Sequence, residues 1–187
     1  MTPSPATASS RLWLVRHAAP LVPPGTCYGA WDVPADAQAT RAAAERLATA
    51  LPPGGRAVCV AYSTLQRCEL LAHELQALRP DLTFTPDARL REMDFGRWEG
   101  QTWDAIGKSA IDTWVAGFAT HAPGGGESLA HMLHRVAAAL QTAQAWRTEL
   151  GVKEVVWITH AGVARCVAWL QERGESALPR SEDWPVA

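Results

Sequence analysis

The chain has 187 residues, a formal net charge of −2 and 19% charged residues. This length is enough for one α/β domain with a sizeable core, and the charge offers no basic field that would favour nucleic acid. No apolar run reaches the roughly 18 residues that a membrane span requires. We therefore expect a cytoplasmic protein without a nucleic-acid or membrane partner, and the sequence does not indicate its oligomeric state.

The organisation of the chain is predicted to be simple. Residues 1–10 are small, polar and Pro-containing, and they predict a disordered leader rather than a signal peptide. Residues 11–173 are expected to form a single domain, and residues 174–187 a loosely ordered tail. Four cysteines are scattered without a CxxC pair, which predicts reduced, mostly buried thiols rather than a disulfide frame or a zinc site.

Two apolar runs end in histidine. Residues 12–15 predict a buried strand that leads directly to Arg16 and His17, and residues 155–159 predict another that leads to His160. A single histidine at a strand end is more often structural than functional. In an open parallel sheet, however, ligands bind at the carboxyl ends of strands, so two such histidines with an arginine beside the first indicate one shared site.

The loop after the first strand, residues 18–34, is rich in Pro and Gly. It is longer than the roughly 12–15 residues at which loops become uncommon and are often functional. We take Thr26, Tyr28 and Gly29 from it as candidate substrate-binding residues. A helix is predicted over residues 39–51, because an Ala-rich run there ends at a Pro-Pro-Gly-Gly segment.

The second predicted strand, residues 57–62, is followed by Ser63, which we expect to cap a helix over residues 64–78. Ser63 is also a candidate substrate-binding residue. Arg67 falls in the first turn of that helix, where it can project over the strand ends beside a helix N-terminus that favours anions. A solvent-exposed arginine is an equally good interpretation of this spacing.

A short strand is predicted over residues 82–85, before a charged, Gly-containing segment. If that segment is extended, Glu92 and Asp94 share a face, and either carboxylate can face the site. A solvated charged loop is the competing interpretation. A single helix is predicted over residues 103–118, and its tryptophans, together with Trp98, either line an apolar pocket or fill a core.

The last third of the chain reads as a Gly-rich loop, a long helix over residues 129–150, the strand that leads to His160, and a final helix over residues 161–172. The loop, residues 123–128, is either a linker or a weak candidate for a phosphate-binding loop. The order of these elements predicts a three-layer α/β/α fold with a mostly parallel central sheet.

These residue types suit phosphoryl transfer. Two guanidiniums match phosphate oxygens with forked donors. A neutral imidazole among them can attack phosphorus, and a second imidazole can stabilise the transferred charge. Glu92 can protonate the leaving alcohol. Because the arginines supply the positive charge, we expect no metal and no cofactor, and a small phosphorylated metabolite as the partner.

Five segments carry a family resemblance. Residues 14–18 (LVRHA) resemble the RHG signature of the histidine phosphatase superfamily, also called the phosphoglycerate mutase-like fold. Residues 62–68 (YSTLQRC) are similar to its S-x-L-x-R segment, and residues 90–100 (LREMDFGRWEG) to its L-x-E-x-x-F-G-x-W-E-G segment. Residues 125–128 (GGES) and 159–162 (THAG) continue the match, in the order of the family.

The resemblance implies a role for each matched position. His17 becomes the phosphohistidine, Arg16, Arg67 and His160 hold the phosphoryl group, and Glu92 is the proton donor. Ala161 joins the candidate substrate-binding residues. It stands, like Ala18, where the family usually has glycine; if either position needs a positive φ, alanine there is costly.

A finer resemblance points to the α-ribazole phosphatase-like branch, which acts late in cobalamin assembly. It rests on residues 25–29 and on the Trp-Glu-Gly of residues 98–100. The leading hypothesis is thus a phosphomonoesterase, with α-ribazole phosphate as a candidate substrate. The alternatives are a phosphoglycerate mutase-type phosphotransferase and a non-catalytic protein that binds a phosphorylated ligand.

Overall fold

The computed structural model describes residues 10–53 and 55–185. Its centre is a four-stranded, wholly parallel sheet in the order β1-β4-β2-β3. The strands are β1 (Arg11–Arg16), β2 (Val58–Tyr62), β3 (Thr83–Pro86) and β4 (Glu154–Thr159). Each lies within a residue or two of its predicted bounds, because short apolar runs indicate strands well. The prediction that the first strand is buried is wrong: β1 lies at the edge of the sheet, and none of its residues is buried.

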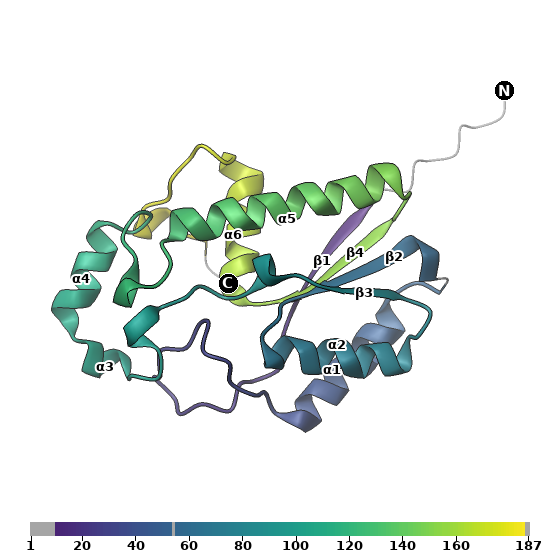
Figure 1. The fold of residues 1–187 in the computed structure, drawn as a ribbon, viewed down its shortest axis with the longest axis horizontal. Coiled ribbons are helices and arrows are strands. Elements are labelled where there is room, and N and C mark those ends of the chain that lie inside the picture. Colours follow the sequence, from purple (N-terminus) through teal and green to yellow (C-terminus); the bar gives the residue numbers. More distant parts are fainter. Residues whose placement is uncertain (1–9, 54, 186–187) are drawn as a thin grey trace.

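Helices cover both faces of the sheet (Figure 1). The side chains of β4 alternate between two apolar clusters, as the period of two in a strand requires. Val156 and Ile158 pack with α1 (Ala37–Ala50) and α2 (Gln66–Leu78). Val155 and Trp157 lie in the second cluster with residues of α5 (Leu129–Glu149) and α6 (Ala161–Arg173). The predicted three-layer α/β/α architecture is therefore confirmed.

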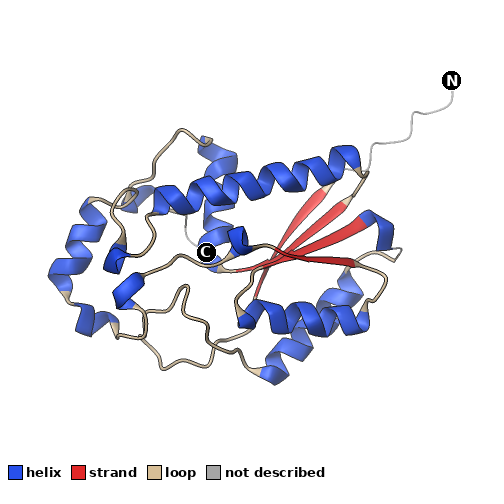
Figure 2. Ribbon diagram, in the orientation of Figure 1, coloured by secondary structure: helices blue, strands red, loops and turns tan. Residues whose placement is uncertain are grey.

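The prediction of a single helix over residues 103–118 is wrong. Gly107, with φ of 84°, divides it into α3 (Trp103–Ile106) and α4 (Lys108–Ala116). A positive φ is open to glycine at little cost and interrupts the helical hydrogen-bond ladder. These two short helices lie at the left end of the molecule in Figure 2, apart from the sheet.

The predicted start of the second helix is also wrong. α2 begins at Gln66, because Leu65 is extended and the N–H of Ser63 still pairs with the carbonyl of Ile158 at 3.0 Å. The free N–H of Gln66 donates instead to Oδ1 of Asp32 at 2.7 Å. A side chain 34 residues away therefore caps the helix, which local spacing does not reveal.

The structure also bears on the predictions for the cysteines, the glycine-rich loop and the two ends of the chain. All four cysteines are free, and three of them are buried. The glycine-rich residues 123–128 pack against the chain near Phe95, where a Cβ on Gly124 would overlap the Phe95 carbonyl. No helix in the described part of the chain is long and apolar enough to cross a membrane. The predicted leader, except for Ser10, and the last two residues of the predicted tail lie outside the described residues.

Candidate active site

The two predicted histidines meet at the carboxyl edge of the sheet. β1 and β4 are neighbours, with Arg16 paired in register with Thr159, and the N–H of His17 donates to the Thr159 carbonyl at 3.2 Å. The imidazole rings of His17 and His160 consequently lie 5.1 Å apart, measured between centroids. Adjacent parallel strands that end together bring these rings into one site, as the sequence predicted.

His17 is held in a form suited to nucleophilic attack. Its ring is buried, and Nδ1 lies 2.6 Å from the carbonyl oxygen of Ala18. A carbonyl only accepts, so Nδ1 carries the proton and Nε2 keeps its lone pair. Burial, with smaller contributions from the charges of Arg67 and Arg16, lowers the pKa of His17 to about 4. The ring is neutral near pH 7, which a nucleophile requires.

His160 is held beside His17 by a hydrogen bond to Ser63. Its Nε2 lies 2.8 Å from Oγ of Ser63, and that hydroxyl already accepts from the N–H of Leu65. If the Ser63 hydroxyl donates to Nε2, the His160 proton lies on Nδ1. Within the described residues Nδ1 has no hydrogen-bond partner. Burial first, and then the charge of Arg67, hold the pKa of His160 well below its ordinary value.

Arg67 is fully buried, which removes the solvent-exposed alternative. Nη1 donates to the carbonyl of Trp31 at 2.9 Å and Nη2 to that of Gly29 at 2.5 Å, while Nε has no partner in the described chain. Its guanidinium also lies 5.7 Å from the centre of the Tyr28 ring. The loop therefore fixes the plane of the guanidinium and leaves donors for an anion.

The loop that binds Arg67 is itself held by Glu99. The Glu99 carboxylate accepts from the N–H groups of Gly29, Ala30 and Trp31, at 2.8, 2.9 and 3.1 Å, and from that of Phe95 at 2.9 Å. Sequence reasoning missed this role of Glu99. Its position in the Trp-Glu-Gly segment was a signal, but the residues it serves lie some 70 positions earlier in the chain.

The structure also chooses between the two carboxylates that spacing left open. Glu92 lines the central cavity, where its oxygens accept from the N–H of Met93 and of Gly162, each at 3.0 Å. The second contact places the carboxyl group at the N-terminus of α6. Asp94 is exposed and instead accepts from the N–H of Gly96 at 2.7 Å.

A cavity of about 360 Å³ joins these residues. One part carries the polar groups and the residues of the first loop: Arg16, His17, Thr26, Tyr28, Arg67, Glu92 and Ala161. The rest is mainly apolar and includes five large aromatic side chains: Phe95, Trp103, Trp114, Phe118 and Trp184. Trp103 and Trp114 stack with their ring planes 9° apart, and both line the cavity. Of the two roles left open for the tryptophans, these two therefore line a pocket.

Two predicted binding residues lie behind this surface. Gly29 and Ser63 are buried and are not among the cavity-lining residues; they contact Arg67 and His160 respectively. A direct contact of either with substrate stays a prediction. Sequence reasoning missed Trp184, which lies in the expected tail but packs edge-on against Phe118 with ring centroids 6.0 Å apart.

The two alanines that replace glycines are compatible with the backbone. No residue other than glycine has a positive φ in the described chain, so Ala18 and Ala161 are unstrained. Ala161 lines the cavity, and the Ala18 carbonyl orients His17.

Four of the buried side-chain nitrogens that have no hydrogen-bond partner in the described residues belong to residues that line this cavity or lie beside it. They are Nε of Arg67, Nδ1 of His160, Nε1 of Trp114 and Nε of Arg165. Leaving a buried donor unpaired costs about 1–3 kcal/mol, so such groups usually mark a place for an acceptor. Arg67 lines the cavity together with His17, and the His160 ring lies 5.1 Å from the His17 ring.

Comparisons with known proteins agree with this geometry. A family model described as the histidine phosphatase superfamily (branch 1) matches residues 12–182. A comparison with curated proteins finds no significant match.

Solved structures with the same fold include three that cover most of both chains. TTHB049 from Thermus thermophilus is 32% identical over 90% of this chain and 88% of its own, with a TM-score of 0.63. A mycobacterial glucosyl-3-phosphoglycerate phosphatase, Rv2419c, in complex with inorganic phosphate is 27% identical over 86% and 78%, with a TM-score of 0.71. A structure titled mycobacterial hydrolase 1 is 26% identical over 89% and 81%, with a TM-score of 0.73.

Proposed function

Because this chain is a phosphoric monoester hydrolase of the histidine phosphatase superfamily, we propose that it acts without a metal, through a phosphohistidine on His17. The observation that carries the proposal is the neutral, buried imidazole of His17, whose proton is held at Nδ1 by the Ala18 carbonyl. Arg67 and His160 lie beside it, each with a buried nitrogen that has no partner in the described chain, and these nitrogens suit the oxygens of a phosphoryl group.

In the first step, Nε2 of His17 attacks phosphorus and the bond from phosphorus to the ester oxygen breaks. Arg16, Arg67 and His160 stabilise the charge on the three non-bridging oxygens of the phosphoryl group. Glu92, in its protonated form, gives its proton to the departing alkoxide, which leaves as the alcohol. The products are the free alcohol, a phosphohistidine and the Glu92 carboxylate.

In the second step, water attacks the phosphohistidine. The Glu92 carboxylate takes a proton from the water as its oxygen bonds to phosphorus, and the bond from phosphorus to Nε2 breaks. Inorganic phosphate leaves, His17 returns to its neutral form, and Glu92 is again protonated. The cycle balances without a redox partner or a cofactor.

The substrate is proposed to be a small phosphorylated metabolite whose alcohol carries a ring. The aromatic part of the cavity supports this class, since Trp103, Trp114 and Trp184 offer flat faces and edges for stacking. α-Ribazole phosphate, with an aromatic base on a phosphorylated sugar, is the specific candidate. The likeness to Rv2419c keeps a phosphorylated sugar acid as a second candidate to test.

The test is turnover of p-nitrophenyl phosphate in the presence of EDTA, with His17→Ala alongside. Turnover by the unmodified protein, none by the variant, and no effect of EDTA are expected, since only the nucleophile is removed. Persistent activity in the variant would reject the phosphohistidine, and strong inhibition by EDTA would reject the metal-independent mechanism.

Two further assays address the alternatives. A mutase would show a large drop in activity without a diphosphate primer. A phosphate-binding protein would bind inorganic phosphate and turn over no phosphomonoester. α-Ribazole phosphate and glucosyl-3-phosphoglycerate, compared by kcat/KM, would then separate the two candidate substrates.

A further inference from the structure

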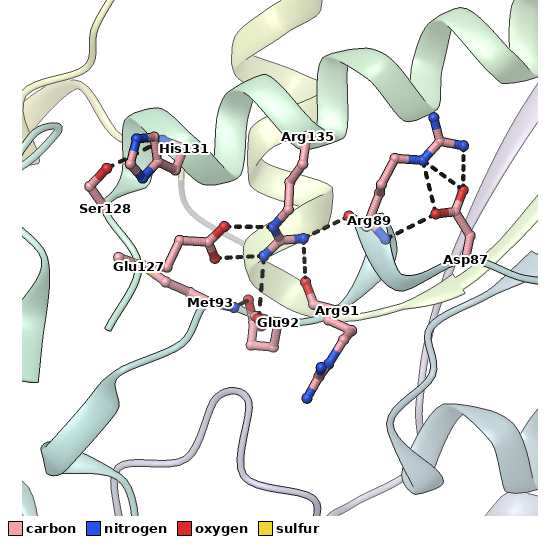
Figure 3. A network of polar contacts seen from close by, with 9 residues as sticks. All are labelled: Asp87, Arg89, Arg91, Glu92, Met93, Glu127, Ser128, His131 and Arg135. Atoms are coloured by element: carbon pink, nitrogen blue, oxygen red, sulfur yellow. Dashed lines mark hydrogen bonds and ion pairs between the residues drawn. The ribbon is translucent and has the colours of Figure 1, made fainter. Parts of the chain in front are cut away.

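Arg135 on α5 uses every nitrogen of its guanidinium within one network (Figure 3). Nε and Nη2 donate to the two carboxylate oxygens of Glu127, at 2.7 and 2.8 Å. Nη1 donates to the carbonyls of Arg89 and Arg91, at 2.6 and 2.7 Å, and Nη2 also reaches the carbonyl of Glu92 at 3.3 Å. One side chain thus binds three carbonyls in a stretch of four residues that ends at Glu92.

This network is largely shielded from solvent. The side chains of Arg135 and Glu127 are 20% and 18% exposed. The paired charges compensate each other, and the bidentate geometry fixes the guanidinium plane from which the carbonyl contacts are made. Glu127 therefore orients Arg135, and Arg135 orients the backbone.

Glu92 is consequently held from two sides. Its carbonyl is bound by Arg135, from α5, and its carboxylate by the N–H of Gly162, from α6. Arg135 does not line the aromatic cavity; it lines a second cavity, of about 420 Å³, on the other side of the Glu92 segment. Apart from its positive charge, which also acts on His160 and which lysine would keep, Arg135 is linked to the aromatic cavity by its hydrogen bond to the Glu92 carbonyl.

We propose that Arg135, oriented by Glu127, is a positioning residue that fixes the Glu92 carboxyl for proton transfer to the leaving group. This inference rests on the proposed function, in which Glu92 is the general acid. Proton transfer is sensitive to the distance between donor and acceptor, and displacements near 1 Å cost activity. Lysine cannot replace the arginine, because a single ammonium lacks the planar fork that spans a carboxylate and three carbonyls.

The experiment compares two esters that share a ring but differ in leaving group. p-Nitrophenyl phosphate releases a stable phenolate that needs little protonation, whereas benzyl phosphate releases an alkoxide that needs a proton. Arg135→Lys and Glu127→Gln should lower kcat/KM on benzyl phosphate by about tenfold or more, and on p-nitrophenyl phosphate by less than about twofold. Inhibition by inorganic phosphate should be unchanged, because the groups around His17 are not altered.

The matched control is Arg89→Lys. Arg89 lies in the same segment, but its side chain donates to Asp87 and to the carbonyl of Ala138 and makes no hydrogen bond to Glu92. This control should keep the ratio of the two kcat/KM values. Thermal unfolding of each variant distinguishes a loss of stability from a displacement of the Glu92 carboxyl. Arg135→Met serves as a second variant, which removes the guanidinium altogether.

A double variant tests the route through Glu92. In the Glu92→Gln background, Arg135→Lys should not change the ester ratio further, because the group being positioned is gone. Equal losses on both esters, or the same change of ratio in Arg89→Lys, would overturn the inference while leaving the phosphohistidine mechanism in place. Absence of turnover by the unmodified protein would instead overturn the proposed function and this inference with it.

Discussion

The backbone N–H of Gly162 donates to Oε2 of Glu92 at 3.0 Å, and a Cβ on Gly162 would overlap Oε1 of the same carboxylate. Position 162 does not need glycine for its backbone angles, since its φ is not positive. It needs glycine because the carboxylate rests directly on the first turn of α6. The THAG segment (residues 159–162) and Glu92 are therefore in direct contact, and a change in one should move the other.

Gly162→Ala should displace the Glu92 carboxylate, because the added Cβ would overlap Oε1. Helix propensity favours alanine by about 1 kcal/mol, so the fold should remain stable. We expect kcat/KM on benzyl phosphate to fall by at least about tenfold, with a smaller loss on p-nitrophenyl phosphate. Steady-state kinetics on both esters, with thermal unfolding as the control, measures this. An unchanged ester ratio would contradict the role of this contact.

Glu99→Gln should weaken phosphate binding, although Glu99 itself does not line the cavity. The amide has one acceptor oxygen in place of two and brings an NH₂ toward backbone N–H groups, which leaves buried donors unpaired. Because Gly29 and Trp31 bind Arg67, the arginine should lose its fixed plane. We expect a loss of about 1–3 kcal/mol in unfolding free energy and weaker inhibition by inorganic phosphate. Urea unfolding and phosphate inhibition test the two effects separately, and normal phosphate inhibition would disprove the link.

Trp184→Ala should change substrate preference rather than chemistry. Trp184 lines the aromatic part of the cavity and packs on Phe118. An aromatic contact contributes about 0.5–1.5 kcal/mol beyond burial, so KM for benzyl phosphate should rise by roughly 3- to 10-fold. KM for glycerol 2-phosphate, which carries no ring, should change little. The control is Trp31→Leu, at an exposed side chain outside the cavity, because the hydrogen bonds of Trp31 to Arg67 and Glu99 are made by its backbone. Equal effects of Trp184→Ala on both esters would exclude the aromatic preference.

Acid should destabilise the folded protein before its carboxylates titrate fully. The pKa of His17 is about 4 when folded and near its ordinary value of 6.5 when unfolded, so the unfolded chain binds the proton more tightly. Stability should fall as pH drops from about 6.5 to about 4, and this contribution should level off below. His160, whose pKa is also lowered, acts in the same direction. Urea unfolding across this range should show a shallower loss in His17→Gln, and an identical slope would contradict the assignment.

The strands and the position of the site could be predicted from sequence because their signals are local. The run before Arg16 and His17 is apolar over adjacent residues, which is enough to predict a strand. Its burial could not be predicted in this way, because β1 lies at the edge of the sheet and none of its residues is buried. The predicted helix boundaries are wrong where a single backbone angle or a distant capping side chain decides where the helix begins or ends. Gly107 and Asp32 are the two cases, and neither leaves a clear trace in local periodicity.

What the sequence by itself determined is the set of reactive groups and the edge of the sheet where they gather, because strand direction places Arg16, His17 and His160 together. What only the tertiary structure decided is how each group is held. Glu92 rather than Asp94 faces the cavity because a helix N-terminus 70 residues later receives its carboxylate. Arg67, Glu99 and Arg135 likewise depend on hydrogen bonds to distant backbone, and such contacts exist only when the chain has folded.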